Sequence, residues 1–432
     1  MKSTNSIHEC TLKCILFKPK TCPKKKEIKT GVKNKLAPRT QEEIDQFDFS
    51  RYNPKATTKA YEERIQYLET RGISTENLSG KINFNNPEEY KTNIENFIGM
   101  AQIPVGLAGP ILINGSNAQG DFLVPLATTE GALIASYTRG MKACRLSGGI
   151  TTVCLSEGVQ RSPFFRFNTI AEAQFFVGWI QEKRGSFSDI VSETSRYAKL
   201  KAVRHSLEGN SVIVTFEYTT GDAAGQNMVT ICTDQLCQFI IANTPIQPER
   251  WYIESNYSGD KKATARAFSN VRGKKITSEV IIPKAICEKT LRTTPIQIAR
   301  YCQASTLAAI QSGAIGAQGH IANGLTALFI ACGQDVACIA ESSIGLTRME
   351  VNKKGDLYVA LTLPALIVGT VGGGTALPTQ KECLEMLKCS GAGNANKFAE
   401  ICCAVALAGE ISIVAAMAAN HFSSAHQKLG RK

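Results

Sequence analysis

The sequence lacks the short motifs that mark the commonest nucleotide-binding and hydrolase sites. No G-x-G-x-x-G follows a predicted strand and no G-x-x-x-x-G-K-[ST] occurs, so neither a Rossmann domain nor a P-loop is expected. There is no G-x-S-x-G elbow, and no spacing of His, Cys and carboxylate residues is typical of a metal site. We therefore expect no metal, and chemistry by proton transfer and oxyanion stabilisation.

The start of the chain lacks an apolar segment long enough for a signal peptide, and the 15 cysteines show no regular pairing pattern. Most cysteines lie inside apolar runs, which predicts reduced core thiols in a cytoplasmic protein. The most apolar long stretch, residues 401–419, contains Glu410 and is rich in alanine and glycine. It predicts a packed core helix and no membrane span, so we expect a soluble protein.

The net charge of +12 is unevenly distributed. Residues 1–40 carry eleven Lys and Arg against Glu9 and Glu27, a net charge of +9, and only +3 belongs to the other 392 of the 432 residues. The basicity therefore belongs to a tail that we expect to be disordered and solvated. A weak contact of this tail with a membrane surface or nucleic acid is the alternative, but no nucleic-acid partner is expected for the fold.

Changes in composition divide the chain into four parts. After the tail (1–40), residues 41–92 are polar and helix-prone, and dense apolar segments with glycine and proline begin near 93. Residues 163–252 mix predicted strands at 164–167 and 211–218 with helical patterns near 170–184 and 226–243. We predict an α+β fold: a helical N-terminal region, a large mixed domain (93–162 and 253–432) and a small inserted α+β domain (163–252).

Glu130 lies between two apolar segments. Residues 122–127 predict a buried strand, and residues 131–136 predict a helix for which Thr128 and Thr129 are N-cap candidates. A desolvated carboxylate there would have a raised pKa and could act as a general acid. The alternative is a surface glutamate that complements the helix dipole.

Four more segments carry residues suited to chemistry. Residues 256–262 (NYSGDKK) form a polar turn with two lysines, which is otherwise a solvated charged loop. Asp335 lies in a second apolar stretch and resembles Glu130 in this respect. His320 and Asn323 stand three residues apart in 313–323 (GAIGAQGHIAN), where a lone histidine is more often a core residue. Residues 369–375 (GTVGGGT) allow a backbone to approach a ligand closely.

In this order, the segments resemble the catalytic portion of class I 3-hydroxy-3-methylglutaryl-CoA (HMG-CoA) reductases. The matching segments are 95–99 with 103–110 (a dimerisation segment), 127–131 (ATTEG), 221–227 (GDAAGQN), 259–262 (GDKK), 332–335 (CGQD) and 369–375. The resemblance runs from about residue 60 to the end. It implies a soluble catalytic portion without the family's membrane anchor, a central helix in the large domain and a non-Rossmann, ferredoxin-like cofactor domain. A homodimer or homotetramer is also implied.

The resemblance implies the four-electron reduction of HMG-CoA to mevalonate and free CoA by two NADPH, a step of isoprenoid biosynthesis. In this family a lysine stabilises the oxyanion, and Lys261 matches it. His426 matches the histidine that protonates the CoA thiolate. Glu130 matches the donor of a proton to the alkoxide, and Asp335 matches a carboxylate between the lysine and the glutamate.

Binding residues are carried over in the same way. By resemblance, Ser195, Arg196 and Tyr197 grip the adenosine 2′-phosphate of NADPH. The other cofactor residues implied are Asp222, Gln226, Asn227 and Gly373. The substrate-binding residues implied are Arg161, Asp260, Lys262, His320 and Asn323, with Ser136, Arg139 and Lys142 for the CoA portion.

The sequence departs from the family pattern near the substrate carboxylate. Glu254 replaces a serine, Gln303 falls on the position of a carboxylate-binding lysine, and Arg300 lies one helical turn earlier. Thr138 stands where asparagine is usual. Two alternatives therefore stay open: a reductase of a different acyl-CoA, or a catalytically inactive homologue that acts through its basic tail.

Overall fold

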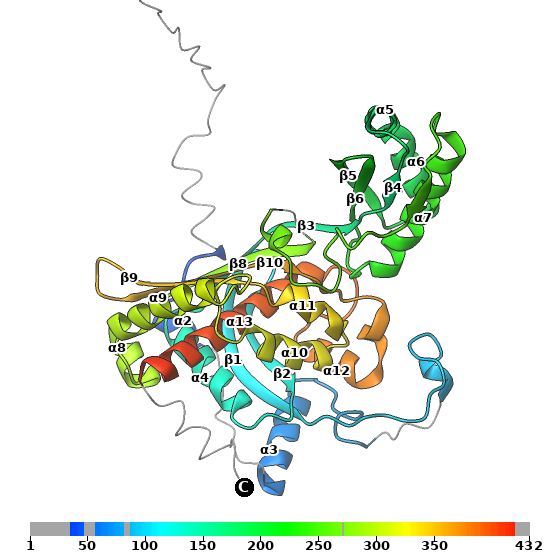
Figure 1. The fold of residues 1–432 in the computed structure, drawn as a ribbon. Coiled ribbons are helices and arrows are strands. Elements are labelled where there is room, and N and C mark those ends of the chain that lie inside the picture. The colour runs from blue at the N-terminus through cyan, green and yellow to red at the C-terminus, as the bar shows by residue number, and fades with distance from the viewer. Residues whose placement is uncertain (1–34, 47–56, 82–86, 270–271, 420–432) are drawn as a thin grey trace, which may run out of the picture.

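The computed structural model describes residues 35–46, 57–81, 87–269 and 272–419 (Figure 1). Ten strands form one sheet in the order β7-β4-β6-β3-β8-β10-β9, with β1 and β2 attached through β3, and β5 paired with β6. The pairs are antiparallel except β1 with β3. The strands are β1 (Val105–Gly115), β2 (Gln119–Ala127), β3 (Ile150–Arg161), β4 (Phe164–Arg166), β5 (Lys199–Glu208), β6 (Ser211–Thr219), β7 (Arg250–Tyr252), β8 (Gly273–Ile282), β9 (Leu346–Val351) and β10 (Leu357–Leu366).

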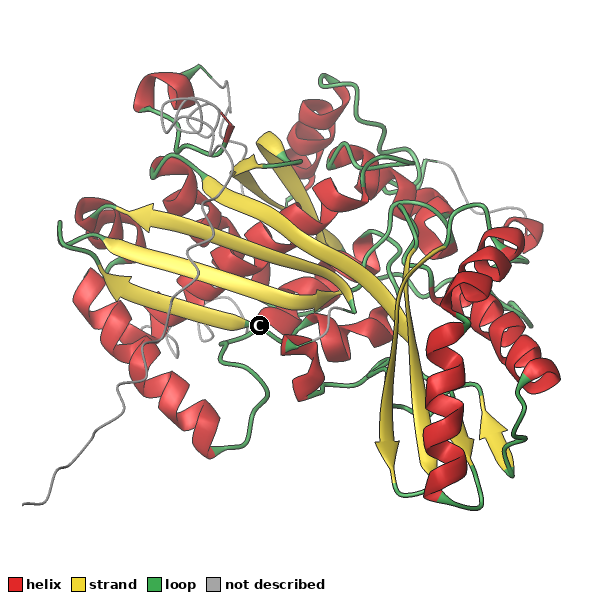
Figure 2. Cartoon of the chain, turned by 90° about the horizontal axis from the view of Figure 1, so that it is seen from above, coloured by secondary structure: helices red, strands yellow, loops and turns green. Residues whose placement is uncertain are grey.

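Helices cover this sheet and supply its connections (Figure 2). The α-helices are α2 (Gln41–Asp45), α3 (Thr58–Glu69), α4 (Leu133–Leu146), α5 (Ile170–Glu182), α6 (Arg184–Thr194), α7 (Gln226–Asn243), α8 (Lys284–Ile286), α9 (Pro295–Gln311), α10 (Ile321–Ala331), α11 (Ile339–Ser342), α12 (Pro378–Met386) and α13 (Ala395–Ala418). Short 3-10 or π turns are η1 (Pro87–Tyr90), η2 (Ala265–Phe268), η3 (Cys287–Leu291), η4 (Val336–Cys338) and η5 (Gly373–Ala376).

The larger part of the molecule, which we call the main body, is organised around α13. This helix runs through its centre and packs against α4, α9, α10 and the sheet (Figure 1). Gly140 of α4 permits the close approach, because a Cβ there would lie 1.9 Å from the carbonyl oxygen of Ala408. α13 is the one described helix long and apolar enough to cross a membrane, but 83% of its apolar window is buried. That burial favours the predicted core helix.

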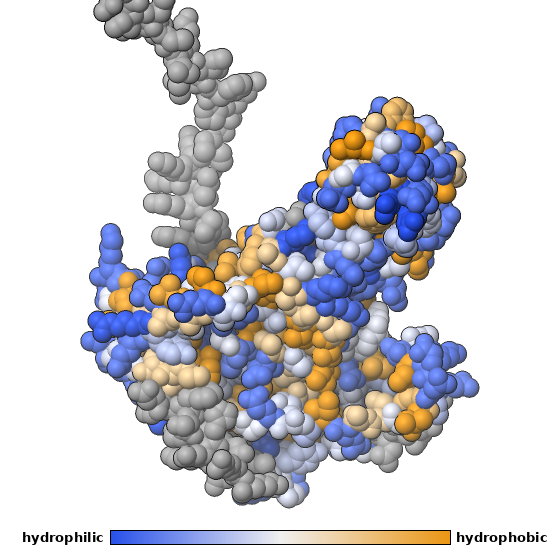
Figure 3. Space-filling view, in the orientation of Figure 1, coloured by the Kyte–Doolittle hydropathy of each residue, from blue (hydrophilic) through white to orange (hydrophobic). Residues whose placement is uncertain are grey.

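A second hydrophobic core, formed by residues between Val159 and Trp251, lies in a unit that projects from the main body (Figures 1 and 3). Its strands lie in the order β7-β4-β6-β5, and α5, α6 and α7 cover them. β3 joins the two parts, since its first residues pair with β8 of the main body and Val159–Arg161 pair with β6. The projecting unit therefore shares a strand with the main body.

The mixed helix-and-sheet fold expected from the sequence is confirmed. α7 covers the predicted residues 226–243, and β4 and β6 lie where strands were predicted. β5 and the separate helix α6 were not predicted. The predicted disordered tail lies outside the described residues up to position 34.

Candidate functional site

Three of the matched segments meet beside the start of α7. The amide of Thr370 donates to the carbonyl of Asp222 at 2.8 Å, and Ala223 forms a parallel bridge with Val371. The amide of Gly369 donates to Oε1 of Gln334 at 2.9 Å. A Cβ on Gly333 would lie 2.2 Å from the carbonyl oxygen of Gly374, so only glycine permits this approach. Tertiary structure thus joins the GDAAGQN, CGQD and GTVGGGT segments.

The lysine loop between β7 and η2 reaches the same place. The ammonium of Lys261 forms an ion pair with Oδ2 of Asp335 at 2.9 Å. The hydrogen bond that Lys261 donates to Asp335 is the main reason that the pKa of Lys261 is raised, so its side chain is held as a cation. Because both side chains are partly exposed, the ion pair contributes little to folding, and its ammonium is accessible to a ligand.

Asp260 connects the lysine loop to two arginines. Its carboxylate pairs with Arg161, at the end of β3, at 3.1 Å and with the buried Arg272. Arg272 also pairs with the buried Glu341 at 3.0 Å and donates to Oε1 of Gln226 at 2.7 Å. The sequence prediction missed Arg272 and Glu341, although both contact predicted site residues.

Asp260, Cys338 and Glu341 lie close enough for their ligand atoms to hold a metal ion. The chemistry of this cluster argues against one. Arg272 and Arg161 already pair with the two carboxylates, and burial raises the pKa of the Cys338 thiol, which would have to ionise to bind. We therefore assign the cluster to an ion-pair network.

Glu130 does not lie in the buried position expected from its apolar neighbours. Its side chain is exposed in the single chain, and its carboxylate has no partner among the described residues. The helix also begins later than predicted, at Leu133, with Ala132 in the left-handed conformation at the N-cap. Thr128 instead accepts a hydrogen bond from the amide of Glu130 at 3.0 Å, so neither threonine caps α4.

Asp335 is likewise more exposed than expected from the apolar stretch around it. α10 ends at Ala331, and Gly333 turns the chain with a φ of 65°. Asp335 then caps η4 by accepting a hydrogen bond from the amide of Ala337 at 3.1 Å. It therefore lies at a loop-to-helix junction and is free to face Lys261.

His320 is held at the N-terminus of α10, and Asn323 is exposed in the first turn. The buried Glu410 of α13 accepts hydrogen bonds from the amides of Gly319 and His320 at 2.6 and 2.7 Å. The His320 ring stacks on Tyr137, with ring centroids 5.5 Å apart. Glu410, which had no predicted role, thus fixes the loop that carries His320.

The residues predicted for the CoA portion lie on α4. Ser136 and Arg139 both contact Ser412 of α13, with Oγ to Oγ at 3.0 Å and Arg139 to the Ser412 carbonyl at 2.7 Å. Burial lowers the pKa of Arg139 from its ordinary value. Lys142 is exposed. The structure therefore gives Ser136 and Arg139 a helix-packing contact within the chain.

The predicted cofactor residues fall into two groups. Arg196 and Tyr197 are exposed in the turn after α6, where Ser195 accepts hydrogen bonds from the amides of Tyr197 and Ala198. Asp222 accepts hydrogen bonds from the amides of Gly393 and Ala395 and so holds the start of α13. Of the other three predicted residues, Gln226 is half-buried and accepts a hydrogen bond from Arg272, and Asn227 and Gly373 are exposed beside the segments that meet here. His426 lies outside the described residues.

Comparison with known proteins decides the family. The model of the hydroxymethylglutaryl-coenzyme A reductase family matches residues 60–431. The chain belongs to this family. HMG-CoA reductases of Pyrococcus abyssi and Methanocaldococcus jannaschii are 42% and 41% identical to it, each over 86% of this chain and 93% of the relative. A class II enzyme of Streptococcus pneumoniae, solved with NADPH bound in open conformations, has the same fold at 19% identity (TM-score 0.67; 88% of this chain, 99% of that chain).

Two departures from the pattern of HMG-CoA reductases can now be placed. Oε2 of Glu254 accepts a hydrogen bond from the amide of Ser162 at 3.2 Å, next to Arg161. Its Oε1 is buried without a partner among the described residues. Gln303 is exposed on α9, as is Arg300. Glu254 therefore adds a carboxylate that holds the backbone of the residue after Arg161.

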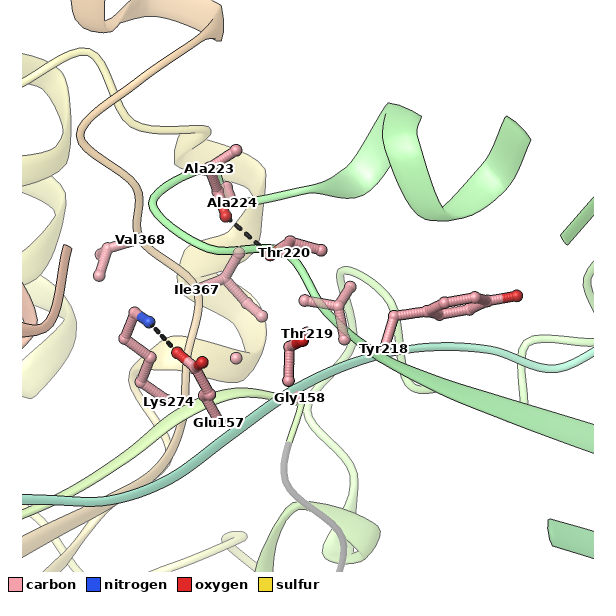
Figure 4. Close-up of a pocket in the computed structure, with 12 residues that line it drawn as sticks. Glu157, Gly158, Tyr218, Thr219, Thr220, Ala223, Ala224, Lys274, Ile367 and Val368 are labelled. Atoms are coloured by element: carbon pink, nitrogen blue, oxygen red, sulfur yellow. Dashed lines mark hydrogen bonds and ion pairs between the residues drawn. The ribbon is translucent and has the colours of Figure 1, made fainter. Parts of the chain in front are cut away.

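The junction between the main body and the projecting unit encloses a small pocket (Figure 4). Strands β3, β6 and β8 line it, together with part of the GDAAGQN segment and the two residues after β10. The ammonium of the buried Lys274 points toward Glu157 across one wall, and Tyr218 points away toward Thr233. The ion pair occupies the polar part of this pocket, so we assign it to the connection between the two parts.

Proposed function

We propose that this chain reduces HMG-CoA to mevalonate and free CoA with two NADPH. The observation that carries this proposal is the Lys261–Asp335 ion pair beside the GDAAGQN and GTVGGGT segments. A cation held at one position is what a carbonyl oxygen needs when hydride addition makes it negative. The Streptococcus pneumoniae relative binds NADPH, which supports the choice of cofactor.

When bound, NADPH supplies the two hydrides. Residues in the turn after α6 fit its 2′-phosphate, because the exposed Arg196 offers a planar fork of donors. Lys261 then stabilises the oxyanion formed at the thioester carbon, and the C–S bond breaks to release CoA thiolate. His426 protonates that thiolate. After the second hydride addition, Glu130 gives its proton to the alkoxide, which yields the alcohol.

This role for Glu130 requires a partner subunit. Its carboxylate is exposed in the single chain, whereas a general acid works best in a partly desolvated site. The segment that resembles the family's dimerisation segment exposes apolar side chains, with Ile98 fully exposed and Val105 40% exposed. We propose a homodimer or a dimer of dimers in which the second subunit covers Glu130.

We also propose that the chain is of class I and that the projecting unit is its cofactor domain. The resemblance of its motifs to class I enzymes supports the class, and its identity with the class II enzyme is only 19%. With α5 and α6 taken together, the unit has the element order β-α-β-β-α-β of a ferredoxin-like domain. Its proposed bounds are residues 163–252.

A different acyl-CoA is the second candidate substrate, and Glu254 is the observation that favours it. Glu254 adds a negative charge at the backbone of Ser162, the residue after Arg161, and this charge would repel a substrate carboxylate bound there, while Gln303 supplies no positive charge. Charged hydrogen bonds contribute about 1.5–3 kcal/mol each, so this loss would weaken HMG-CoA binding by roughly 10- to 100-fold.

The test is oxidation of NADPH by the purified full chain, assayed with HMG-CoA and with acyl-CoAs that lack the terminal carboxylate. We expect turnover with HMG-CoA and mevalonate as the product. Faster turnover of an uncharged acyl-CoA would favour the second candidate. No oxidation of NADPH or NADH with any acyl-CoA would refute both.

A further inference from the structure

Lys261 is held at two points by a single short segment. Its ammonium pairs with Asp335 at 2.9 Å, and its amide donates to Oε1 of Glu341 at 3.1 Å. Asp335 and Glu341 stand at the two ends of the η4–α11 segment. This segment therefore determines both where the backbone of Lys261 lies and where its side chain points.

The backbone contact matters because Lys261 has an uncommon conformation. Its φ of 55° lies in the left-handed region, which a lysine adopts only when its surroundings impose it. The glycine before Asp260, Gly259, also has a positive φ of 75°. Glu341 is 2% exposed, so its bond to the Lys261 amide is shielded from competing water.

Arg272 holds Glu341 in turn and extends the network to the projecting unit. Its guanidinium, 3% exposed, contacts Glu341, Asp260 and Oε1 of Gln226. Gln226 is the first residue of α7 and also accepts a bond from Arg161. One buried arginine thus connects the lysine loop, the η4–α11 segment and the start of the helix beside the proposed nicotinamide site.

We propose that Arg272 and Glu341 are positioning residues that fix Lys261 against the substrate carbonyl and couple its position to the cofactor side of the site. The inference rests on the proposed function, in which Lys261 acts on that carbonyl. Both residues are almost fully buried, so we assign neither a contact with substrate. Their effect is on the geometry of Lys261, and displacement by about 1 Å costs on the order of 10²-fold in rate.

The first test compares Glu341→Ala with Glu341→Gln in the full chain. Hydrogen–deuterium exchange is measured on a peptide covering residues 256–264, together with kcat and the affinity for NADPH. In Glu341→Ala the Lys261 amide loses its acceptor, so we expect exchange about tenfold faster in this peptide and a kcat lower by about 10²-fold. The glutamine retains an acceptor oxygen, and we expect it to restore slow exchange and most of kcat.

Glu382→Ala is the matched control. Glu382 is also buried and accepts hydrogen bonds from the amides of Asn77 and Leu78, away from the lysine loop. Its loss should speed exchange near residues 74–80 and leave kcat unchanged. Wild-type exchange in the 256–264 peptide of Glu341→Ala, or faster exchange throughout that chain, would overturn the proposal.

Arg272→Lys keeps the charge and loses the forked geometry. We expect a kcat about tenfold lower and a weaker affinity for NADPH, because Gln226 loses the shorter of its two arginine contacts. Wild-type kcat and wild-type NADPH affinity in Arg272→Lys would count against the coupling. This test does not depend on whether Glu341→Ala folds. Hydrogen–deuterium exchange and NADPH affinity are measured without turnover. An inactive wild-type chain would therefore refute the proposed reaction, and the two measurements would still test this inference.

Discussion

The main body and the projecting unit bury different kinds of side chain. The core of the projecting unit is aromatic, with Phe165, Phe167 and Phe176 packed ring against ring. The core of the main body is aliphatic and rich in alanine and cysteine, and holds nine of the twelve described free cysteines. It also buries glutamates that accept hydrogen bonds from backbone amides distant in sequence, as Glu400 does from Asn117 and Ala118.

This difference matches the groups that each part carries. A buried carboxylate that binds backbone amides fixes a loop in one position, and in the main body the loops of Lys261 and His320 are held in this way. Within the described part of the projecting unit, the predicted phosphate-binding residue Arg196 lies in an exposed turn over an aromatic core. The comparison indicates that buried hydrogen bonds fix the loops whose side chains we propose to act in the reaction.

The largest expected effect is on the stability of the aromatic core of the projecting unit. Phe176→Ala should lower the free energy of unfolding of the projecting unit by about 3–5 kcal/mol, because Phe176 is fully buried among three other rings. Both tryptophans, Trp179 and Trp251, lie in this unit, so their fluorescence reports its unfolding in urea. The adjacent Phe175, 55% exposed, is the matched control, and Phe175→Ala should change stability by less than about 0.5 kcal/mol. Equal losses in both variants would contradict the assignment of the core.

Alkaline pH should destabilise the main body more than the projecting unit. Burial raises the pKa of four main-body thiols, Cys287, Cys383, Cys389 and Cys403, from 9.0 to about 12. A thiol with a raised folded-state pKa contributes its full stability below about pH 9 and loses it as the pH rises towards 12. Each should lose about 1 kcal/mol between about pH 9 and 10, a total of about 4 kcal/mol.

In the projecting unit, burial raises the pKa of Cys237 to about 12 and also raises that of Cys232, so the corresponding loss there is about 1–2 kcal/mol. Urea unfolding at the two pH values, followed by circular dichroism for the whole chain and by tryptophan fluorescence for the unit, measures both. Cys403→Ala should reduce the pH dependence of the main body alone. Equal pH dependence in the two signals would show that the thiols do not distinguish the parts.

The sequence predicted the fold where its periodicity was local and regular. α7 and β2 follow from apolar spacing alone, and the core position of α13 follows from an apolar stretch that contains Glu410. The predicted start of α4 was wrong, because Ala132 adopts a left-handed conformation before the helix begins at Leu133. For Asp335 a signal was present: Gly333 marks the end of α10 and predicts that the next residues leave the apolar helix.

The ion-pair network could not be predicted from the sequence. Arg272 precedes Gly273, Lys274 and Lys275, and such a run usually predicts an exposed basic turn. Its burial depends on Glu341 and Asp260, which come from two other segments. The pairing of Lys261 with Asp335 agrees with the position that the resemblance implied, but spacing alone did not indicate it.

Lys261→Ala should separate chemistry in the main body from binding in the projecting unit. We expect a kcat lower by about 10²–10³-fold, equal to about 2.7–4 kcal/mol of transition-state stabilisation, with NADPH affinity largely intact. Steady-state kinetics and fluorescence titration with NADPH measure the two quantities. Lys381, which forms a surface pair with Glu385, supplies the control Lys381→Ala, for which wild-type kinetics are expected. Wild-type turnover by Lys261→Ala would refute the proposed role.

Arg196→Ser tests the cofactor site that we propose in the projecting unit, and it should have the smallest effect. Arg196 is exposed in the turn after α6, so its removal costs the fold little, and any loss should appear in cofactor affinity. The loss of one charged hydrogen bond to the 2′-phosphate, about 1.5–3 kcal/mol, predicts NADPH affinity lower by roughly 10- to 100-fold. NADH lacks that phosphate, so its affinity should not change. Arg250→Ser, which removes an exposed arginine of the same unit, is the matched control. A parallel loss for NADPH and NADH would place Arg196 away from the phosphate and would make the projecting unit a less specific cofactor site than we propose.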